Sequence, residues 1–529
     1  MLEVWALFVR GGWMSNLKIS RLSFEYEDSN RYIFENLNLD LDTNWKLGLI
    51  GRNGRGKTTF LNLLRGKYRG TGQIQGNVSF SYYPVKIQNA KNITFYELQD
   101  QVAFEQWKLE RELTLMNLDP DLLWQPFNTL SGGEQTKILL ALSFIDQDSF
   151  SLIDEPTNHL DETSRRQVAE YLNKHDQGYI VVSHDRDFLN QVTDHILAIE
   201  NTAIHLYQGN YSTYETTKKR RDDFDRERNK KLEGQVKKLN QEKVQFHNWA
   251  AKIEARKKMG MKTQYIINRR TRVNKAGIGH QAAKMMKKSI NARNRMDKRI
   301  AEKEGMLKNI EKVPTLTMNF QADYHREILQ LNDLSLQLKN SRELFKNLTL
   351  SLNNHEIIAV EGKNGSGKST LIKYLLGITQ NLIAKGSYEL IENLKISYLP
   401  QEFVMYSGSL KDFAKKYHLS YEALLSNLKK MGFARADFTT RIEKMSMGQQ
   451  KRVALAKSLT EPANLYLWDE PANYLDVFNQ DQLIKLLKSV KPTMLLIEHD
   501  PYFITSVADQ QIKLTRYFYK IILLGKVKL

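Results

Sequence analysis

The sequence GRNGRGKT at residues 51–58 follows the apolar run at residues 47–50 and precedes TFLNLL at residues 59–64, which has helical spacing. This order predicts a strand, a phosphate-binding loop and a helix. Glycines let backbone N–H groups wrap phosphates at the helix N-terminus, Lys57 can neutralise the β and γ oxygens, and the Thr58 hydroxyl can ligate magnesium. The predicted phosphate-binding residues are Gly51, Asn53, Gly54, Gly56, Lys57, Thr58 and Thr59.

Three later stretches extend this prediction towards phosphoryl transfer. SGGEQ at residues 131–135 is expected to open a helix, and residues 150–153 form an apolar run that ends in Asp154 and Glu155. Two carboxylates at a strand end suit different tasks, one holding magnesium and the other polarising the attacking water. A further buried strand ends in His184, which is placed to sense a γ-phosphate. The sequence therefore predicts an ATP-hydrolysing α/β domain.

The same order of motifs returns in the second half of the chain. The separation from Ser131 to Asp154 is 23 residues, as it is from Ser446 to Asp469, and the aspartate-to-histidine separation is 30 residues in both halves. The matching spacings indicate an internal duplication. The second half holds four extra residues between loop and serine motif, which we expect on its helical side. Its candidate site residues are Gly362, Asn364, Gly365, Gly367, Lys368, Ser369, Thr370, Gln401, Ser446, Gly448, Asp469, Glu470 and His499.

Both halves resemble ATP-binding-cassette ATPases, with phosphate loops at 51–58 and 362–369, signatures at 131–135 and 446–450, and paired carboxylates at 154–155 and 469–470. The resemblance implies that each ATP lies between one phosphate loop and the other half's signature. Site one then sets Lys57, Thr58, Asp154, Glu155 and His184 against Ser446 and Gly448. Site two sets Lys368, Ser369, Gln401, Asp469, Glu470 and His499 against Ser131, Gly132 and Gly133. ATP and Mg²⁺ are the implied cofactors, with Thr58, Asp154, Ser369, Asp469 and Gln401 as metal ligands.

Four positions depart from that pattern or leave it open. Tyr26 stands where the family stacks an aromatic ring on adenine, and it is equally readable as a core tyrosine. Val85 replaces the glutamine that Gln401 supplies in the second half. Met447 replaces the first signature glycine, where a Cβ would crowd the backbone. Leu338 stands where the second half would carry the adenine-stacking aromatic. We therefore expect the two sites to differ, with site one the weaker.

The connector between the two halves carries the excess charge of the chain. Residues 211–312 hold 30 Lys and Arg against 12 Asp and Glu, and the whole chain has 78 against 60, so the net charge of +18 resides here. Leu232, Val236, Leu239, Phe246, Ala250 and Ile253 follow a coiled-coil seam in which Lys243 takes the skipped position. Helical spacing resumes at Met296, Ile300, Leu307 and Ile310 until Pro314. We expect two antiparallel helices with a long basic tip at about 257–279, punctuated by Gly260, Gly277 and Gly279.

A basic tip of this kind is a candidate RNA surface, because Lys and Arg contact phosphates and aromatic rings stack on bases. The candidate RNA-binding residues are Lys257, Lys258, Lys262, Tyr265, Arg269, Arg270, Arg272 and Lys275. The bland alternative is a solvated helical spacer. The arrangement resembles the ABC-F proteins, and within them the Lsa/Vga-type resistance factors, which protect ribosomes from lincosamides, streptogramin A and pleuromutilins.

That resemblance implies binding to the tRNA exit site of the bacterial ribosome in the ATP-bound state, with the hairpin pushed towards the peptidyl-transferase centre. The implied partners are large-subunit rRNA and peptidyl-site tRNA, without membrane or DNA. The alternatives are a housekeeping factor that relieves stalled ribosomes and, more remotely, the ATPase subunit of a membrane importer. Zero cysteines argue against a zinc-dependent excision-repair ATPase.

Composition adds the domain plan and the compartment. No run reaches 18 apolar residues, and the absence of cysteine suits a reducing cytoplasm, where we expect the protein. We predict a first cassette at 15–210 with a helical arm at about 86–130, a hairpin linker at 211–317 and a second cassette at 318–529. Residues 1–14 read as a non-native or disordered extension, because they lack the basic start and cleavage site of a signal peptide.

Overall fold

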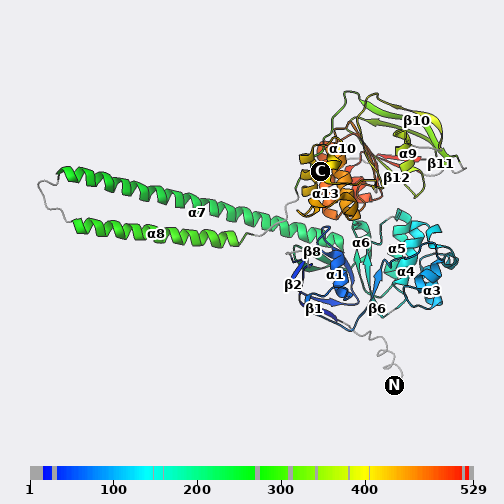
Figure 1. Cartoon of the computed structure of the whole chain (residues 1–529), viewed down its shortest axis with the longest axis horizontal. Coiled ribbons are helices and arrows are strands. Elements are labelled where there is room, and N and C mark those ends of the chain that lie inside the picture. The colour runs from blue at the N-terminus through cyan, green and yellow to red at the C-terminus, as the bar shows by residue number, and fades with distance from the viewer. Residues whose placement is uncertain are drawn as a thin grey trace, which may run out of the picture. The chain divides into compact units, whose positions relative to one another are not determined.

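The computed structural model describes residues 16–26, 32–146, 148–158, 160–267, 275–307, 314–339, 343–378, 382–403, 405–514 and 519–523, with most side chains between 246 and 289 outside that description. The chain divides into two compact units. One contains residues 1–214 together with 313–529, and the other contains residues 215–312. The first unit holds two α/β cassettes, and the second is a helical hairpin (Figure 1).

A six-stranded sheet forms the centre of the first cassette, in the order β5-β6-β7-β3-β8-β9. Neighbouring strands are parallel except for the antiparallel pair β8 and β9. The central strands are short apolar runs, as expected of strands covered on both faces. A three-stranded antiparallel sheet, β2-β1-β4, packs nearby. The strands are β1 (Asn16–Phe24), β2 (Phe34–Asp42), β3 (Lys46–Ile50), β4 (Thr71–Gln75), β5 (Ser79–Tyr83), β6 (Ser149–Asp154), β7 (Tyr179–Val182), β8 (His195–Glu200) and β9 (Ala203–Gln208).

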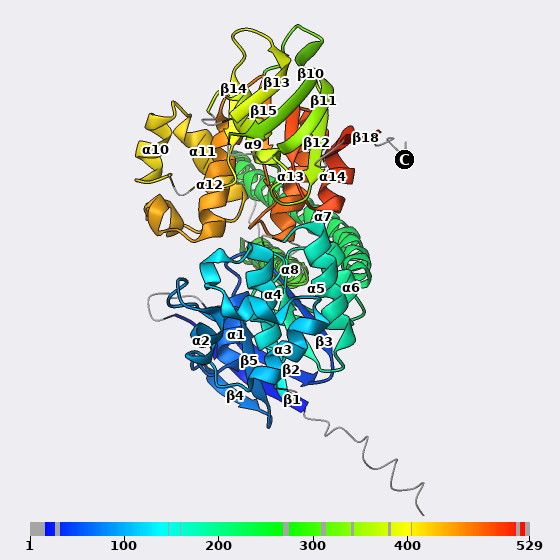
Figure 2. The ribbon, with the colours of Figure 1, turned by 90° about the vertical axis from the view of Figure 1, so that its right-hand side faces the viewer.

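Helices of the first cassette fall into two groups (Figure 2). The core group contains α1 (Lys57–Leu64), α5 (Glu162–Lys174) and α6 (Arg186–Val192), and the arm contains α2 (Thr94–Gln99), α3 (Gln106–Leu115) and the 3-10 turns η1 (Pro120–Trp124) and η2 (Phe127–Thr129). The arm leads into α4 (Gly132–Leu142), whose N-terminus is closed by a capping box between Ser131 and Glu134. The predicted helix start at Ser131 is therefore confirmed, and it fixes where the signature faces.

The second cassette repeats this design strand for strand. Its sheets have the orders β14-β15-β16-β12-β17-β18 and β11-β10-β13. The strands are β10 (Glu327–Leu338), β11 (Glu343–Asn353), β12 (Ile357–Gly362), β13 (Leu382–Leu390), β14 (Ile396–Leu399), β15 (Leu465–Asp469), β16 (Met494–Ile497), β17 (Gln510–Leu514) and β18 (Tyr519–Leu523). The helices are α9 (Lys368–Leu375), α10 (Leu410–Lys416), α11 (Tyr421–Lys430), α12 (Met447–Thr460), α13 (Val477–Val490) and α14 (Pro501–Val507), with the turns η3 (Asp437–Thr439) and η4 (Ile442–Lys444).

The strand registers correct the predicted place of the four extra residues. Lys18 pairs with Asp40 and Gln75 in the first cassette, and its counterpart Gln330 pairs with Ser351 and Glu389 in the second. The offset between copies is thus 311 residues on β2 and already 314 on β4. Three of the four extra residues are therefore present by β13, ahead of the helical arm, and the prediction of an insertion on the helical side was wrong.

The hairpin unit consists of two long helices, α7 (Tyr211–Ile267) and α8 (Lys275–Gly305) (Figure 1). Both run further into the predicted tip than expected, since Gly260 lies inside α7 and Gly277 and Gly279 lie inside α8. Helix interiors tolerate isolated glycines at a cost of about 1 kcal/mol relative to alanine. At its other end α8 stops at Gly305, earlier than the stop predicted at Pro314. Ile310 lies outside the described residues.

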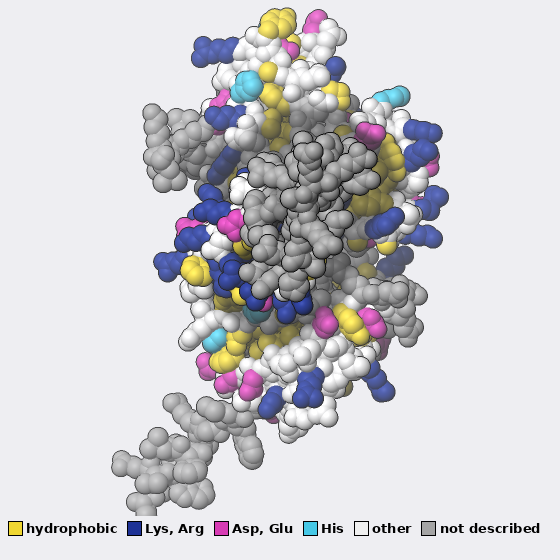
Figure 3. Space-filling view, turned by 90° about the vertical axis from the view of Figure 1, so that its left-hand side faces the viewer, with side chains coloured by type: hydrophobic (Ala, Val, Ile, Leu, Met, Phe, Trp, Pro, Cys, Tyr) yellow, Lys and Arg dark blue, Asp and Glu magenta, His cyan; other side chains and the backbone are white. Residues whose placement is uncertain are grey.

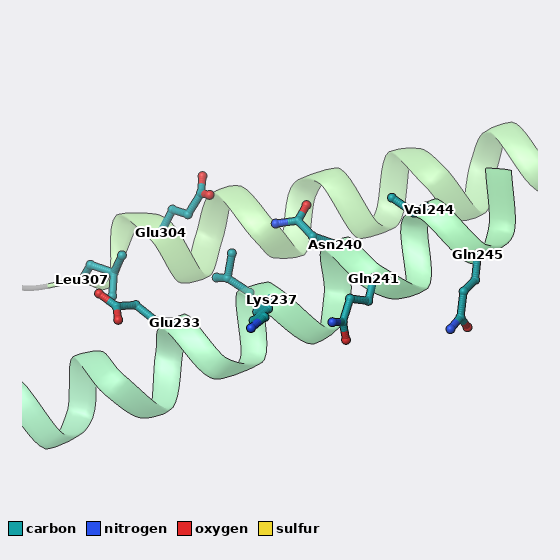
Figure 4. A pocket seen from close by; sticks show the side chains of 9 residues that line it. Glu233, Lys237, Asn240, Gln241, Val244, Gln245, Glu304 and Leu307 are labelled. Atoms are coloured by element: carbon teal, nitrogen blue, oxygen red, sulfur yellow. The ribbon is translucent and has the colours of Figure 1, made fainter. Parts of the chain in front are cut away.

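Within the hairpin, the predicted seam is visible where side chains are described. Four seam residues are half-buried between exposed polar residues: Leu232, Val236, Leu239 and Met296. A fifth, Ile300, is buried. Lys243, at the skipped seam position, pairs with Asp297 on α8. A 900 Å³ hollow between the helices is lined by Val236, Val244 and Leu307 among polar side chains (Figure 4). The two antiparallel helices expected from the spacing are therefore present.

Both ends of the linker are anchored in the cassettes. Tyr211 and Tyr214, on the first turn of α7, are buried in the core of the first cassette. On the return, Leu316 is buried in the second cassette and the amide of Thr317 donates to Asn427. No helix in the described part of the chain is long and apolar enough to cross a membrane.

Candidate functional site

The first phosphate loop joins β3 to α1 and is held open by its own lysine. Gly54 and Gly56 adopt φ of 79° and 94°, and a Cβ at Gly56 would lie 2.5 Å from Ile33. Lys57 is buried and donates to the carbonyl of Gly51 at 2.9 Å and to Asn53 Oδ1 at 3.0 Å. Burial lowers the pKa of Lys57. The ammonium group thus lies inside the loop, where a phosphate would replace carbonyl oxygens as its partner.

Behind this loop, the end of β6 presents the predicted carboxylate pair. Asp154 accepts hydrogen bonds from the hydroxyl of Thr58 at 2.8 Å and of Tyr82 at 3.4 Å. Glu155 takes a left-handed conformation (φ 57°) and lies 3.0 Å from His184 Nε2. Burial raises the pKa of Glu155 to about 8 and lowers the pKa of His184 well below its ordinary value. A neutral His184 therefore lies beside a carboxyl group whose pKa is close to neutral pH.

In the second cassette, the equivalent lysine, carboxylates and histidine have the same arrangement but fewer hydrogen-bond partners. Lys368 donates to the carbonyls of Gly362 at 2.7 Å and Lys363 at 3.1 Å. Asp469 is fully buried, neither carboxylate oxygen has a hydrogen bond, and burial raises its pKa to about 6. Glu470 has φ of 51° and lies 3.6 Å from His499, whose pKa burial lowers to about 3. An unpartnered buried carboxylate of this kind fits a cation.

Residues of both cassettes enclose site one. A 300 Å³ cavity is lined by Asn53, Gly54, Glu155, Asn158 and His184 of the first cassette and by Ser446, Gly448, Gln449, Arg452 and Tyr474 of the second. The amide of Asn53 donates to Asp476 at 2.6 Å, and its side chain donates to the carbonyl of Tyr474 at 3.1 Å. The structure thus brings Ser446 and Gly448 to the first phosphate loop, as the resemblance implied.

Site two is assembled differently. Its 330 Å³ cavity is lined by Asn364, Gly365, Gly367, Lys368, Ser369, Thr370, Gln401, Glu470, Asn473 and His499, joined from the first cassette by Leu160 and Arg165. Ser131, Gly132 and Gly133 are not among the residues that line it. The predicted pairing of this signature with the second phosphate loop therefore stays a prediction, although Asp161 of the same cassette accepts from the amide of Asn364.

The structure shows the surroundings of the four positions that depart from the family pattern or leave it open. Tyr26 bonds to the Thr59 hydroxyl at 2.7 Å, and its ring is 40% exposed beside the loop, so one face is open. Val85 is half-buried against the core, whereas Gln401 is exposed. Leu338 is 38% exposed. Met447 is half-exposed, and its counterpart Gly132 has no atom within 4 Å of an added Cβ. The crowding of a bound phosphate by Met447 therefore stays a prediction.

Four residues of site one lie outside the predicted set of site residues. Tyr82 bonds to Asp154, while Arg452, Tyr474 and Asp476 come from the second cassette. A signal existed for the tyrosine, because Tyr82 and Tyr398 share one position in the two copies. No local pattern indicates which loop of the other cassette Asn53 will contact.

The candidate RNA-binding residues fall at the far end of the hairpin. Arg269, Arg270 and Arg272 lie outside the described residues. The backbone places Lys257, Lys258, Lys262 and Tyr265 in α7 and Lys275 at the first residue of α8, and their side chains lie outside the described part.

Comparisons with known proteins agree with this geometry. The ABC transporter family model matches residues 34–158 and 345–473. Ribosome protection protein VmlR of Bacillus subtilis (strain 168) is 26% identical over 93% of this chain and 86% of its own length. ATP-binding protein Uup of Buchnera aphidicola is 27% identical over 94% and 80%, and ATP-binding cassette sub-family F member 3 of Mus musculus is 24% identical over 92% and 70%.

Among solved structures, archaeal ribosome recycling factor aABCE1, in complex with the stalk protein aP1, matches with a TM-score of 0.58 at 19% identity, covering 95% of this chain and 89% of that one. The chain is an ATP hydrolase built from two ATP-binding cassettes. More particularly, it belongs to the ABC-F family, to which its relatives and its two cassettes around a helical hairpin assign it.

Proposed function

We propose that this ATPase binds the tRNA exit site of the bacterial ribosome in its ATP-bound state and protects the peptidyl-transferase centre from antibiotics. The antibiotic classes are lincosamides, streptogramin A and pleuromutilins. In this proposal the cassettes are the motor, the hairpin is the part that reaches rRNA and peptidyl-site tRNA, and the site of action is the cytoplasm.

The observation that carries the proposal is the basic hairpin between the cassettes. Residues 211–312 carry the whole net charge of the chain, and from Arg256 to Met296 no acidic residue occurs. Lys and Arg side chains elsewhere are interspersed with Asp and Glu, as the face in Figure 3 illustrates. A polyanion would therefore be attracted to the hairpin more than to the cassettes. The relative VmlR is itself named a ribosome protection protein.

For the motor we propose MgATP in both sites. In site one Thr58 and Asp154 would hold the cation, and in site two Ser369, Asp469 and Gln401 would hold it. The residues fit such a group, because the buried carboxylate of Asp469 has no hydrogen bond and an added cation would offset the cost of its burial. When bound, MgATP supplies the transferable phosphoryl group. Glu155 and Glu470 would take the proton of the attacking water, while His184 and His499 would orient it.

Growth of a susceptible bacterium on a panel of ribosomal drugs tests the proposal. Expression of the chain is expected to raise growth in lincomycin and tiamulin and to leave growth in a drug that binds the small subunit unchanged. The matched control is the same chain with Glu155→Gln and Glu470→Gln, which cannot cycle. Absence of any shift in drug tolerance would refute the resistance function.

The register of the hairpin sharpens a second test. Lys243 lies opposite Asp297 and Gln235 opposite Lys303, so residue numbers that add to about 540 face each other. A cut that keeps the helices paired therefore replaces residues 257–283 with a Gly/Ser turn. The predicted tip of 257–279 would leave the two helices unequal. This variant should keep its ATPase activity and lose protection. Retained protection would reduce the hairpin to a spacer.

A housekeeping role in relieving stalled ribosomes is the second candidate. Its support is that Uup and the mouse sub-family F member are about as similar to this chain as VmlR is. The two roles separate in translation assays. The housekeeping role predicts faster synthesis through a stalling sequence without drug, whereas the resistance role predicts an effect only when drug is present.

A further inference from the structure

Arg186 connects the switch loop of site one to the second cassette. It is the first residue of α6, two residues after His184, and it is only 4% exposed. Its Nη2 donates to Asp481 Oδ1 at 2.5 Å and to the carbonyl of Val477 at 3.4 Å. The guanidinium also lies 4.3 Å from the ring centroid of Tyr502. These three partners belong to the second cassette, and the ring of Tyr211 in the first cassette covers the guanidinium at 5.8 Å.

These contacts close a ring around site one. Asp476 caps α13 and accepts from the amide of Asn53, and Asn53 Oδ1 lies 3.1 Å from His184 Nε2. Val477, the residue after Asp476, is held by Arg186, which follows His184 in the switch loop. The phosphate loop, the start of α13 and the switch loop therefore constrain one another pairwise. Moving the second cassette away would break both bonds that cross between the cassettes, Asn53 to Asp476 and Arg186 to Val477.

Site two has only part of this ring: Asp161 accepts from the amide of Asn364, and Arg165 donates to the carbonyl of His499 at 3.4 Å, but the contact made by Arg186 is missing. The position equivalent to Arg186 is Pro501, which has no donor to offer. The position equivalent to Asp481 is Arg166, whose side chain is 70% exposed and pairs with Glu162 in its own cassette. A further tie across that side, Lys513 to Glu162 at 3.5 Å, joins side chains that are 46% and 38% exposed. Exposed pairs of this kind contribute about 0 to 1 kcal/mol.

We propose that Arg186 is a positioning residue that keeps site one closed against the second cassette while site two opens and exchanges nucleotide. It touches no ATP and acts through the switch loop and α13. A buried guanidinium whose partner is removed becomes an uncompensated charge, so the closed arrangement resists separation. Site one would then retain ATP through several turnovers at site two. The proposal rests on the ATPase activity and is independent of the ribosomal function.

Release of labelled ATP measures this directly. In the full chain with Glu155→Gln and Glu470→Gln, a chase with unlabelled ATP should give a slow phase from site one and a faster phase from site two. The phase that is absent with Lys57→Ala identifies site one. Adding Arg186→Met should accelerate the site-one phase about tenfold or more and leave the other phase unchanged.

The partner variant separates positioning from simple structural support. Asp481→Asn should accelerate the same phase, and Arg186→Met combined with Asp481→Asn should add little to either change alone. Arg186→Lys should restore part of the slow release. Arg166→Met removes an exposed arginine at the position equivalent to Asp481 and is expected to change neither phase. If Arg186→Met proves poorly folded, Asp481→Asn carries the test.

Three results would overturn the inference. The first is an unchanged site-one phase in both Arg186→Met and Asp481→Asn. The second is equal acceleration of both phases, which would indicate a general loss of stability. The third is full additivity of the two substitutions, which would show that the two side chains act independently.

Discussion

The two ATP sites share their motifs and differ in how the opposite cassette reaches them. At site one the second cassette contributes Ser446, Gly448 and Tyr474 to the cavity, and Asp476 accepts from the phosphate loop. At site two the first cassette contributes Leu160 and Arg165, and its signature stays outside the cavity. Equal motifs therefore do not make equal sites, because closure depends on residues that flank the motifs.

Judged by its motifs alone, site one would be the weaker of the two ATP sites. Val85 and Met447 depart from the family pattern at site one, which nevertheless receives more lining residues from the opposite cassette than site two does. A site with irregular motifs and many contacts from the opposite cassette suits retention of nucleotide. A site with regular motifs and fewer such contacts suits turnover. Most steady-state hydrolysis is therefore expected at site two.

The largest expected effect comes from the paired glutamates. Glu155→Gln together with Glu470→Gln should slow phosphate release about 100 to 10,000-fold, because general-base assistance is worth that much. Of the single changes, Glu470→Gln should remove most of the rate. A steady-state phosphate assay decides the matter, and a larger loss from Glu155→Gln would reverse the roles given to the sites.

Next in size is the contrast between the two loop lysines. Lys368→Ala should reduce the steady-state rate about 10 to 100-fold, which corresponds to the loss of charged hydrogen bonds to phosphate. Lys57→Ala should reduce it severalfold less. Measurement of both variants at saturating ATP tests the asymmetry, and equal losses would mean that Val85 and Met447 have no functional consequence.

The pH profile offers a third test. Burial raises the pKa of Glu155 to about 8, so the group is mostly protonated at pH 7 and becomes a usable base as pH rises. In the Lys368→Ala variant, where site one supplies the remaining turnover, kcat/KM should rise about tenfold from pH 7 to pH 9. The same variant with Glu155→Gln should show a flat profile. A flat profile with Glu155 present would contradict the assignment.

The smallest effect is expected at the altered signature. Met447→Gly should change ATP affinity of site one by less than about threefold, because Met447 is half-exposed and the equivalent Gly132 has open space for a side chain. Gly448→Ala provides the contrast, since a Cβ there would lie 3.2 Å from the carbonyl of Tyr474. A large gain from Met447→Gly would show that the first signature glycine matters despite the space.

Local patterns predicted every element that holds a motif. The apolar run before residue 51 forms β3, Ser131 caps α4, and the seam around Lys243 forms a helical pair. These predictions succeed because strand alternation, helix capping and heptad spacing are properties of neighbouring residues. The boundaries succeeded less well. Helices α7 and α8 contain the glycines that were expected to interrupt the predicted tip, because an isolated glycine costs a helix only about 1 kcal/mol.

What the sequence by itself determined is the duplicated α/β cassette, the two carboxylate pairs and the basic helical connector. Only the tertiary structure decided which cassette surfaces meet. Asn53 contacts Asp476 and Arg186 contacts Asp481 across hundreds of residues, and most of the extra residues of the second copy enter ahead of the arm. No spacing rule encodes such pairs. They arise where two folded cassettes bury side chains against each other, and burial turns an ordinary arginine and an ordinary asparagine into parts of one site.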